Sequence, residues 1–569
     1  MKLPPMKSLA RKPIKWSPPF GKITRPDQNP APSDSTPQPT NALGRRALLA
    51  MLPATLAGLT LPEISWAGPG APDTPFGLNV RHCGARGDGV TIDSPSINAA
   101  IEQLAAQGGG TLYFPAGTYA CYTIRLKSRI RLYLDAGAVI LAAPTPKEGL
   151  ATGGYDQDVE LPESYRDYQD HGHSHWRNSL IWGEGLSDIA IEGPGLIWGK
   201  GLGRGHDYDF DMPISGRPGV GDKSIALKLC RNVLLRDFRM LKAGWFALLA
   251  TGVDNLTIDN LLIDTNRDGL DIDCCRNVRV SNCTINAPWD DAICPKSSFA
   301  LGYARATENV TIDNCYVSGS YEIGSVLDGT WKVYPFAPRG SHGRIKFGTE
   351  SNGGFRNITI TNCVFDKCRG LALETVDGAR LEDITISNIT MRDVTTSPVF
   401  LRLGRRMRGP ASLSVGTLRR VLITNITSSG ANRMPSIIAG IEGHPVEDVQ
   451  ISQCHFEQEG GGDEALASII PLQNEAGYPE PTMFGHLPAH GFFVRHARNL
   501  VFSNLSFDLQ TSDARPAFWM QNVEGVHLNA LRLPDQETRF VLNNVTDFAT
   551  TGSLTVPEKR LRKVEHAHF

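Results

Sequence analysis

The stretch RNVLLRDFRM at residues 231–240 recurs as DNLTIDNLLI at 254–263 and as RNVRVSNCTI at 276–285. Successive copies therefore begin 23 and 22 residues apart. Each copy alternates β-branched or other apolar residues with polar ones, which is the period of a strand. Weaker copies begin further along the chain, at residues 308, 356, 382, 419, 447, 498 and 524. A strand-like phrase repeated at this interval predicts a solenoid in which each coil packs on its neighbours.

Two observations narrow the type of solenoid. Segments with the 3.6-residue period of a helix are nearly absent after residue 107, and the regular leucines of leucine-rich repeats are missing. We therefore predict an all-β fold, a right-handed parallel β-helix. Residues 76–119 predict its N-terminal cap, with an amphipathic helix that begins at Asp93 or Ser94 and ends near residue 107. Such a helix would cover the open end of the solenoid.

Two residue types recur at fixed positions of the repeat. Asparagines predict a polar ladder at a turn, at residues 282, 314, 362, 388, 425 and 504. Cysteines occupy the next position, where we expect small buried side chains that stack, at residues 283, 315, 363 and 454. The eleven cysteines are an odd number and most follow the repeat, so they do not predict a disulfide scaffold.

The first 67 residues are expected to lie outside the fold. Residues 1–43 are rich in proline and polar residues, and Arg45-Arg46 precede an apolar run at 47–61. Ser65-Trp66-Ala67 then supplies the small residues that a signal peptidase recognises. This order is typical of a twin-arginine export signal, and the run is too short for a membrane anchor. We predict a bacterial protein that is exported to the periplasm or the exterior.

Three segments follow from these observations: the leader at 1–67, a single domain at 68–557 and a C-terminal tail at 558–569. The net charge of −2 gives no electrostatic basis for binding nucleic acid or an anionic membrane. We expect no cofactor and no metal, and we expect a monomer.

Two aspartate clusters stand out within the repeats. NRDGLDID at residues 266–273 and WDDAI at 289–293 place Asp268 and Asp290 22 residues apart, which is one step of the repeat. If each step is one coil, the two clusters lie on neighbouring coils and their carboxylates crowd together. Like charges at that distance are costly, so the crowding indicates catalysis.

These motifs resemble those of glycoside hydrolase family 28, the polygalacturonases and their pectin-degrading relatives, over roughly residues 76–530. The Asn-x-Asp motif of the family matches Asn266 and Asp268, and its double aspartate matches Asp290 and Asp291, with Lys296-Ser297 following. The resemblance implies inverting hydrolysis of galacturonosyl linkages in polygalacturonate or rhamnogalacturonan. It makes Asp290 the general acid, with Asp268 and Asp291 holding and deprotonating the attacking water. We expect Asp291 to raise the pKa of Asp290, and a gap of about 6.5–9.5 Å between acid and base.

Substrate contacts are less sharply defined. The family's Gly-His-Gly and Arg-Ile-Lys motifs meet here in one run, Ser341-His342-Gly343 followed directly by Arg344-Ile345-Lys346. In the alignment that we favour, IKFGTESNGG from Ile345 is the equivalent of the coil after Gly-His-Gly. The family's basic coil then falls on RGLALET from Arg369, with Glu374 at or near the expected lysine. The other alignment takes Arg344 and Lys346 as the family's basic coil. The candidates for substrate contact are Asn266, Lys296, His342, Arg344, Lys346, Glu350, Glu374 and Arg402.

Two long insertions suggest how substrate is bound. Residues 150–186 carry aromatic residues and three histidines, His171, His173 and His175, and residues 319–343 add further aromatic residues. Such insertions could close one end of a groove and give exo action. Two other functions stay open: a calcium-dependent polysaccharide lyase and a non-catalytic carbohydrate-binding β-helix.

Overall fold

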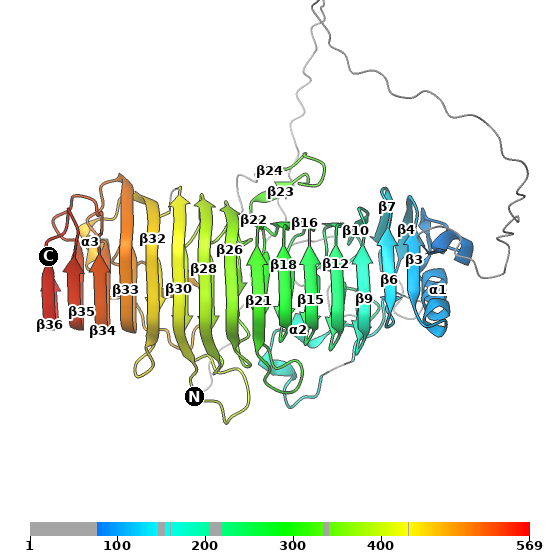
Figure 1. Ribbon diagram of the computed structural model, residues 1–569, viewed down its shortest axis with the longest axis horizontal. Coiled ribbons are helices and arrows are strands. Elements are labelled where there is room, and N and C mark those ends of the chain that lie inside the picture. Colours follow the sequence, from blue (N-terminus) through cyan, green and yellow to red (C-terminus); the bar gives the residue numbers. More distant parts are fainter. Residues whose placement is uncertain (1–76, 146–153, 160, 204–217, 334–340, 431) are drawn as a thin grey trace, which may run out of the picture. The chain divides into compact units, whose positions relative to one another are not determined.

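A computed structural model describes residues 77–145, 154–159, 161–203, 218–333, 341–430 and 432–569. The expected leader at 1–67 lies outside these residues. The described residues belong to one compact unit, in which parallel strands from successive coils lie side by side (Figure 1). The predicted all-β parallel solenoid is therefore confirmed.

One sheet of six strands carries the first aspartate cluster, including Asp268, on its strand β17. Its strands pair in parallel in the order β20-β17-β14-β11-β8-β5. We call it the site sheet. Its members are β5 (Ile124–Arg125), β8 (Ser179–Glu184), β11 (Lys223–Lys228), β14 (Phe246–Thr251), β17 (Asp268–Asp273) and β20 (Ile293–Lys296).

The remaining strands form the other faces of the coils in a second, larger sheet, apart from the antiparallel pair β23 (Tyr321–Ile323) and β24 (Lys332–Val333). The early coils contribute β1 (Leu78–Asn79), β2 (Asp88–Ile92), β3 (Gly110–Phe114), β4 (Gly117–Cys121), β6 (Ile130–Leu134), β7 (Ala138–Ala142), β9 (Ser187–Glu192) and β10 (Leu196–Trp198). The middle coils contribute β12 (Arg231–Arg236), β13 (Arg239–Leu241), β15 (Asp254–Asp259), β16 (Leu262–Asp264), β18 (Arg276–Ser281), β19 (Thr284–Asn286), β21 (Thr307–Asp313) and β22 (Tyr316–Ser318). The late coils contribute β25 (Lys346–Phe347), β26 (Phe355–Asp366), β27 (Leu371–Thr375), β28 (Arg380–Arg392), β29 (Val399–Leu403), β30 (Thr417–Ser429), β31 (Ser436–Ala439), β32 (Val446–Gly460), β33 (Phe492–Thr511), β34 (Phe518–Asn529), β35 (Phe540–Thr551) and β36 (Lys559–His568).

The repeat explains the stacking. Val233 pairs with Leu256, and Leu256 with Val278, so the alternating apolar residues form continuous buried rows. The expected asparagine ladder is present on the outside, where Asn425 Nδ2 donates to Asn388 Oδ1 at 3.1 Å and Asn388 donates in turn to Asn362 at 3.0 Å. These asparagines have positive φ, which their short side chains tolerate at a turn. All eleven cysteines are free thiols, and those at the predicted repeat positions are buried.

Both ends of the solenoid are covered. Helix α1 (Ser94–Ala106) forms where the sequence predicts it and buries Ile97, Ile101 and Leu104. At the other end, the residues expected as a C-terminal tail instead form β36, which pairs antiparallel with β35. This strand forms because Leu561 and Val564 face the end of the core, while the polar residues between them remain outside.

Short helices lie in the loops: η1 (Val80–Cys83), η2 (Arg166–Tyr168), α2 (His171–Ser174), α3 (Glu464–Ala467) and η3 (Pro481–Phe484). Among the described residues, no helix combines the length and the apolar character that a membrane crossing requires.

Candidate active site

Three successive coils bring the candidate catalytic residues together. Leu270 of β17 pairs with Ile293 of β20, and Ile293 forms a parallel bridge with Ile345. The coil of Asp268, the coil of Asp290 and Asp291, and the coil of Arg344 and Lys346 are thus consecutive. Gly269 permits the close approach, because a Cβ there would lie 2.3 Å from the carbonyl oxygen of Ala292.

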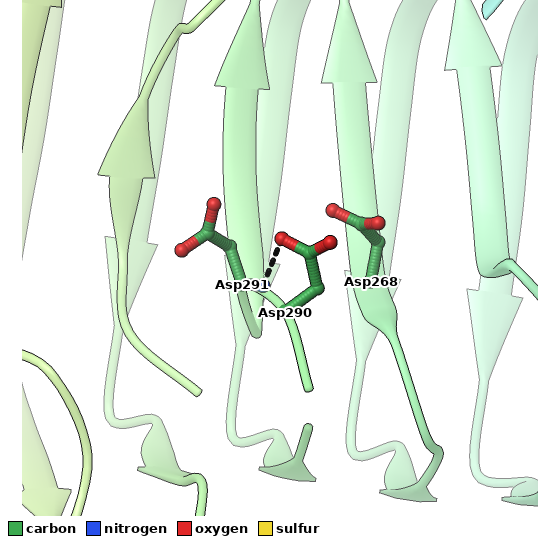
Figure 2. Close-up of side chains that lie close together, drawn as sticks. All are labelled: Asp268, Asp290 and Asp291. Carbon is green, nitrogen blue, oxygen red and sulfur yellow. Dashed lines mark hydrogen bonds between the residues drawn. The ribbon is translucent and has the colours of Figure 1, made fainter. Parts of the chain in front are cut away.

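The three aspartates form one group, as the sequence spacing predicts. Figure 2 shows Asp268 on one strand and Asp290 and Asp291 at the start of the next, with their carboxyl groups side by side. One oxygen of each lies within 4.8 Å of the others. These nearest-oxygen distances are shorter than the gap of about 6.5–9.5 Å that we expected between acid and base.

Asp290 is the most accessible of the three. Its side chain is 24% exposed, whereas Asp268 and Asp291 are buried. Arg267 Nη2 lies 2.6 Å from Asp290 Oδ2, and the backbone N–H of Asp291 donates to Asp290 Oδ1 at 3.1 Å. Burial favours the protonated carboxyl, but the charges of Arg267, His342 and Lys346 together outweigh it, so the pKa of Asp290 lies below its usual value. Our expectation of a raised pKa was wrong, since the sequence repeat does not disclose this ion pair.

Asp291 is held as a carboxylate. Arg344 Nε lies 2.9 Å from its Oδ1, and Lys346 Nζ lies 3.2 Å from its Oδ2. Burial opposes the charge, yet the two cations hold the pKa of Asp291 far below its usual range. The two cations therefore favour the ionised form of this residue.

Asp268 has the opposite character. Burial raises its pKa well above the usual value, and the neighbouring charges of Asp290 and Asp271 add to the effect. The opposite directions of the pKa shifts of Asp268 and Asp290 favour a proton on Asp268 over one on Asp290. The group thus contains one protonated carboxyl beside ionised ones, which is what acid–base catalysis requires.

A buried polar layer lies beside this group. Lys296 Nζ is 3.3 Å from Glu350 Oε2 and 3.6 Å from Asp271 Oδ2. His173, from the histidine-rich insertion, places its Nε2 3.3 Å from Asp271 Oδ2. Burial raises the pKa of Asp271 to about 8 and lowers that of His173 to about 4. In the described part of the chain, the three aspartates are the one group of at least three potential metal ligands at close spacing.

The candidates for substrate contact divide into two sets. Arg344, Lys346, Lys296 and Glu350 lie in or beside the aspartate group, as described above. His342 is half-buried near Asp290 and Asp291, and burial lowers its pKa to about 4. The backbone carbonyl of Asn266 accepts from the N–H of Trp289 at 3.0 Å, which ties the two aspartate motifs together.

Glu374 and Arg402 lie further along the solenoid. Lys346 lies opposite Ala372 in the strand register, so Glu374 is on the coil after Arg344. In the strand register, Glu374 of β27 lies opposite Arg402 of β29, on the following coil. Arg402 donates to the carbonyl oxygens of Gly440 and Asn474, at 3.1 and 3.2 Å, and within the described residues it forms no hydrogen bond or ion pair with an aspartate of the group.

Three residues near the aspartates were not identified from the sequence. Arg267 lies inside the first aspartate motif, and a single basic residue among aspartates was a signal from which an ion pair at the site could have been predicted. Tyr478 and Glu480 come from the loop between β32 and β33, and they belong to no repeat from which their position could be predicted. Glu480 contacts Arg344 and lies 2.8 Å from Arg369, and the Tyr478 ring lies 5.5 Å from Lys346 Nζ.

Residues 223–529 match the family model described as a right-handed β-helix region, and residues 77–150 match the one described as rhamnogalacturonase A/epimerase, pectate lyase-like. The chain belongs to the right-handed β-helix family. The handedness predicted from the repeat is thereby confirmed.

Curated relatives of this right-handed β-helix include a probable polygalacturonase from Vitis vinifera, 24% identical over 324 residues, which are 54% of this chain and 59% of the relative. The mannuronan C5-epimerase AlgE5 of Azotobacter vinelandii is 39% identical over 82 residues, 14% of this chain and 8% of the relative. The chain thus spans less than two thirds of the length of these relatives.

Two solved structures share the fold. An exopolygalacturonase from Thermotoga maritima is 21% identical with a TM-score of 0.56, covering 76% of this chain and 91% of its own. A family 28 exopolygalacturonase from Yersinia enterocolitica is 18% identical with a TM-score of 0.57, covering 79% and 77%. These similarities agree with the family resemblance found in the sequence.

Proposed function

We propose that the protein is an exported glycoside hydrolase that cleaves pectic poly- or oligosaccharide, at galacturonosyl linkages of polygalacturonate or rhamnogalacturonan. The observation that carries this proposal is the group of Asp268, Asp290 and Asp291, with oxygens within 4.8 Å and opposite pKa shifts. Carboxyl groups whose surroundings drive their pKa values apart supply the acid and the base of glycoside hydrolysis.

In our mechanism, Asp268 and Asp290 share one proton. Asp290, the accessible member, delivers it to the glycosidic oxygen as the bond to the anomeric carbon breaks. Asp268, then ionised, accepts a proton from the attacking water, whose oxygen bonds to that carbon. Asp291 orients the water, since a carboxylate held by two cations is a weak base. Proton transfer from Asp268 to Asp290 restores the starting state.

The stereochemistry is part of the proposal. Family resemblance implies inversion, whereas the nearest-oxygen distances approach the carboxyl separation of about 5–5.5 Å that is usual for retaining enzymes. We favour inversion, because both aspartate motifs match those of the inverting family.

Exo action is supported by what covers the site on both sides. Helix α2 lies on Phe246, which pairs with Asp268, and a Cβ at Gly172 would be 2.5 Å from the Phe246 ring. On the other side, the loop between β32 and β33 reaches the site, where Glu480 contacts Arg344 and the Tyr478 ring lies 5.5 Å from Lys346 Nζ. A chain lying along the solenoid would meet both coverings, so we propose that a chain end enters the site.

The test is incubation with polygalacturonate and with rhamnogalacturonan, followed by reducing-end release, product sizing and ultraviolet absorbance. Our proposal predicts new reducing ends, monomeric or very short products from the first minutes, and no unsaturated product. Unsaturated products that require calcium would instead identify a lyase. Oligomers of mixed length at early times would exclude exo action.

Export rests on the leader sequence alone. Replacing Arg45-Arg46 by two lysines in the full chain should retain the protein in the cytoplasm, because the twin-arginine route requires the pair. Unchanged export would contradict the proposed signal.

A further inference from the structure

Each cation that borders the aspartate group within the described residues is already paired with a carboxylate of the protein. The pairs are Arg267–Asp290 at 2.6 Å, Arg344–Asp291 at 2.9 Å, Lys346–Asp291 at 3.2 Å, Lys296–Glu350 at 3.3 Å and Arg369–Glu480 at 2.8 Å. Most of these groups are buried, so their pairing is maintained in low dielectric. An incoming anion would therefore have to displace a carboxylate of the protein.

Glu374 adds a carboxyl on the coil beyond Lys346. Its side chain is 0% exposed, and neither oxygen has a hydrogen-bond partner among the described residues. Its nearest cation is Lys346, 4.0 Å from Oε2, which is already bound to Asp291. Burial raises the pKa of Glu374 to about 8, so the group is mainly neutral below that pH and becomes a further anion above it. In neither form does it supply a positive charge for a second carboxylate.

One surface near the group suits an uncharged ligand. Tyr478 is 53% exposed as a residue, and the Thr349 hydroxyl donates to its phenol oxygen at 2.9 Å. An aromatic ring that is both held and accessible offers a face for the C–H side of a sugar ring. Such stacking requires no charge on the sugar.

We propose that the sugar residue bound between the aspartates and Tyr478 is neutral, a hexose or a deoxyhexose, so that the linkage cut joins a neutral sugar to the pectic chain. This inference rests on the proposed glycoside hydrolase function and specifies its substrate. A uronic acid in this position would leave a carboxylate without a cation beside three aspartates, and unpaired charge is strongly disfavoured in a desolvated site.

The experiment compares polymers that differ only in charge. Polygalacturonate and its carboxyl-reduced form share the same linkages, but the reduced form carries neutral galactose. Rhamnogalacturonan oligosaccharides that end in rhamnose or in galacturonate extend the comparison to deoxyhexose. We expect wild-type kcat/KM to be at least about 100-fold higher for one of the neutral-ended substrates than for its charged counterpart.

Two variants of one residue complete the design. Glu374→Lys introduces an additional cation, and it should raise the kcat/KM ratio of charged to neutral substrate by at least about 10-fold. Glu374→Gln has the same size and adds no cation, so its ratio should stay within about twofold of wild type. If Glu374→Lys does not fold, the wild-type comparison still decides.

Each outcome has one meaning. Preference for neutral ends supports the inference. Preference for galacturonate ends overturns the inference while leaving the glycoside hydrolase intact. Hydrolysis of none of these substrates by folded protein overturns the proposed function, and the inference with it.

Discussion

Replacing Arg344 by methionine tests the buried charge network on which the site depends. The guanidinium is 1% exposed and pairs with Asp291 at 2.9 Å and with Glu480. Methionine keeps most of the side-chain length and removes the charge. Asp291 would retain Lys346 at 3.2 Å, and Glu480 would retain Arg369 at 2.8 Å, so each carboxylate loses one of two cations. Breaking a buried ion pair lowers the free energy of unfolding by about 3–5 kcal/mol. Because Asp291 and Glu480 each keep one cation, we expect Arg344→Met to lower it by about 3 kcal/mol.

The matched control is Arg498→Met. Arg498 also contacts two carboxylates, Glu524 at 2.9 Å and Glu447 at 3.1 Å, but its side chain is 45% exposed. Solvent screening limits such pairs to about 0–1 kcal/mol. The assay is equilibrium urea unfolding followed by circular dichroism, with the midpoints compared at equal slope. Equal losses in the two variants would refute the reasoning, because burial would then add nothing to the strength of the network.

Three further predictions concern titration and stereochemistry. The folded-state pKa of Glu374 is raised to about 8, so wild type loses stability as the pH rises from the unfolded pKa to the folded one, whereas glutamine does not titrate. Glu374→Gln should therefore gain stability relative to wild type between about pH 5 and 8, by at most about 1.4 kcal/mol per pH unit. Thermal unfolding across that range measures the difference, and a constant difference would count against a protonated Glu374. Arg267→Gln should move the alkaline limb of the kcat/KM profile to higher pH, because Arg267 lowers the pKa of the acid Asp290; a shift to lower pH would exclude Asp290 as the acid. Proton NMR of the first product should show the inverted anomer, and a retained anomer would assign the nearby carboxyl groups to a covalent mechanism.

The sequence predicts the arrangement along the solenoid well. A step of 22–23 residues is one coil here, so the 22 residues between Asp268 and Asp290 sufficed to predict neighbouring carboxylates. The apolar alternation predicted the buried rows for the same reason, because stacking depends only on adjacent coils. Helix α1 was predicted from its local pattern within one residue of its observed end.

Features that depend on loops were not predictable in this way. Tyr478 and Glu480 reach the site from about 190 residues beyond Asp290, and nothing in the repeat fixes where a loop folds back. The direction of the Asp290 pKa shift was predicted wrongly, because it depends on the ion pair with Arg267, a side-chain geometry that spacing does not determine. The strand β36 was expected as a tail, because its pairing is antiparallel and departs from the repeat.

The measurement that tests the central claim most directly is reducing-sugar release by wild type and by Asp290→Asn, with Asp383→Asn as the control. Asp383 is an exposed carboxylate paired with Arg420 on the outside of β28, away from the proposed chemistry. The substrate panel is polygalacturonate, its carboxyl-reduced form and rhamnogalacturonan. Our account predicts that Asp290→Asn lowers kcat by at least about 100-fold on the substrate that wild type cleaves, while Asp383→Asn keeps wild-type activity. Release that survives in folded Asp290→Asn would contradict the assignment of the acid and the mechanism built on it.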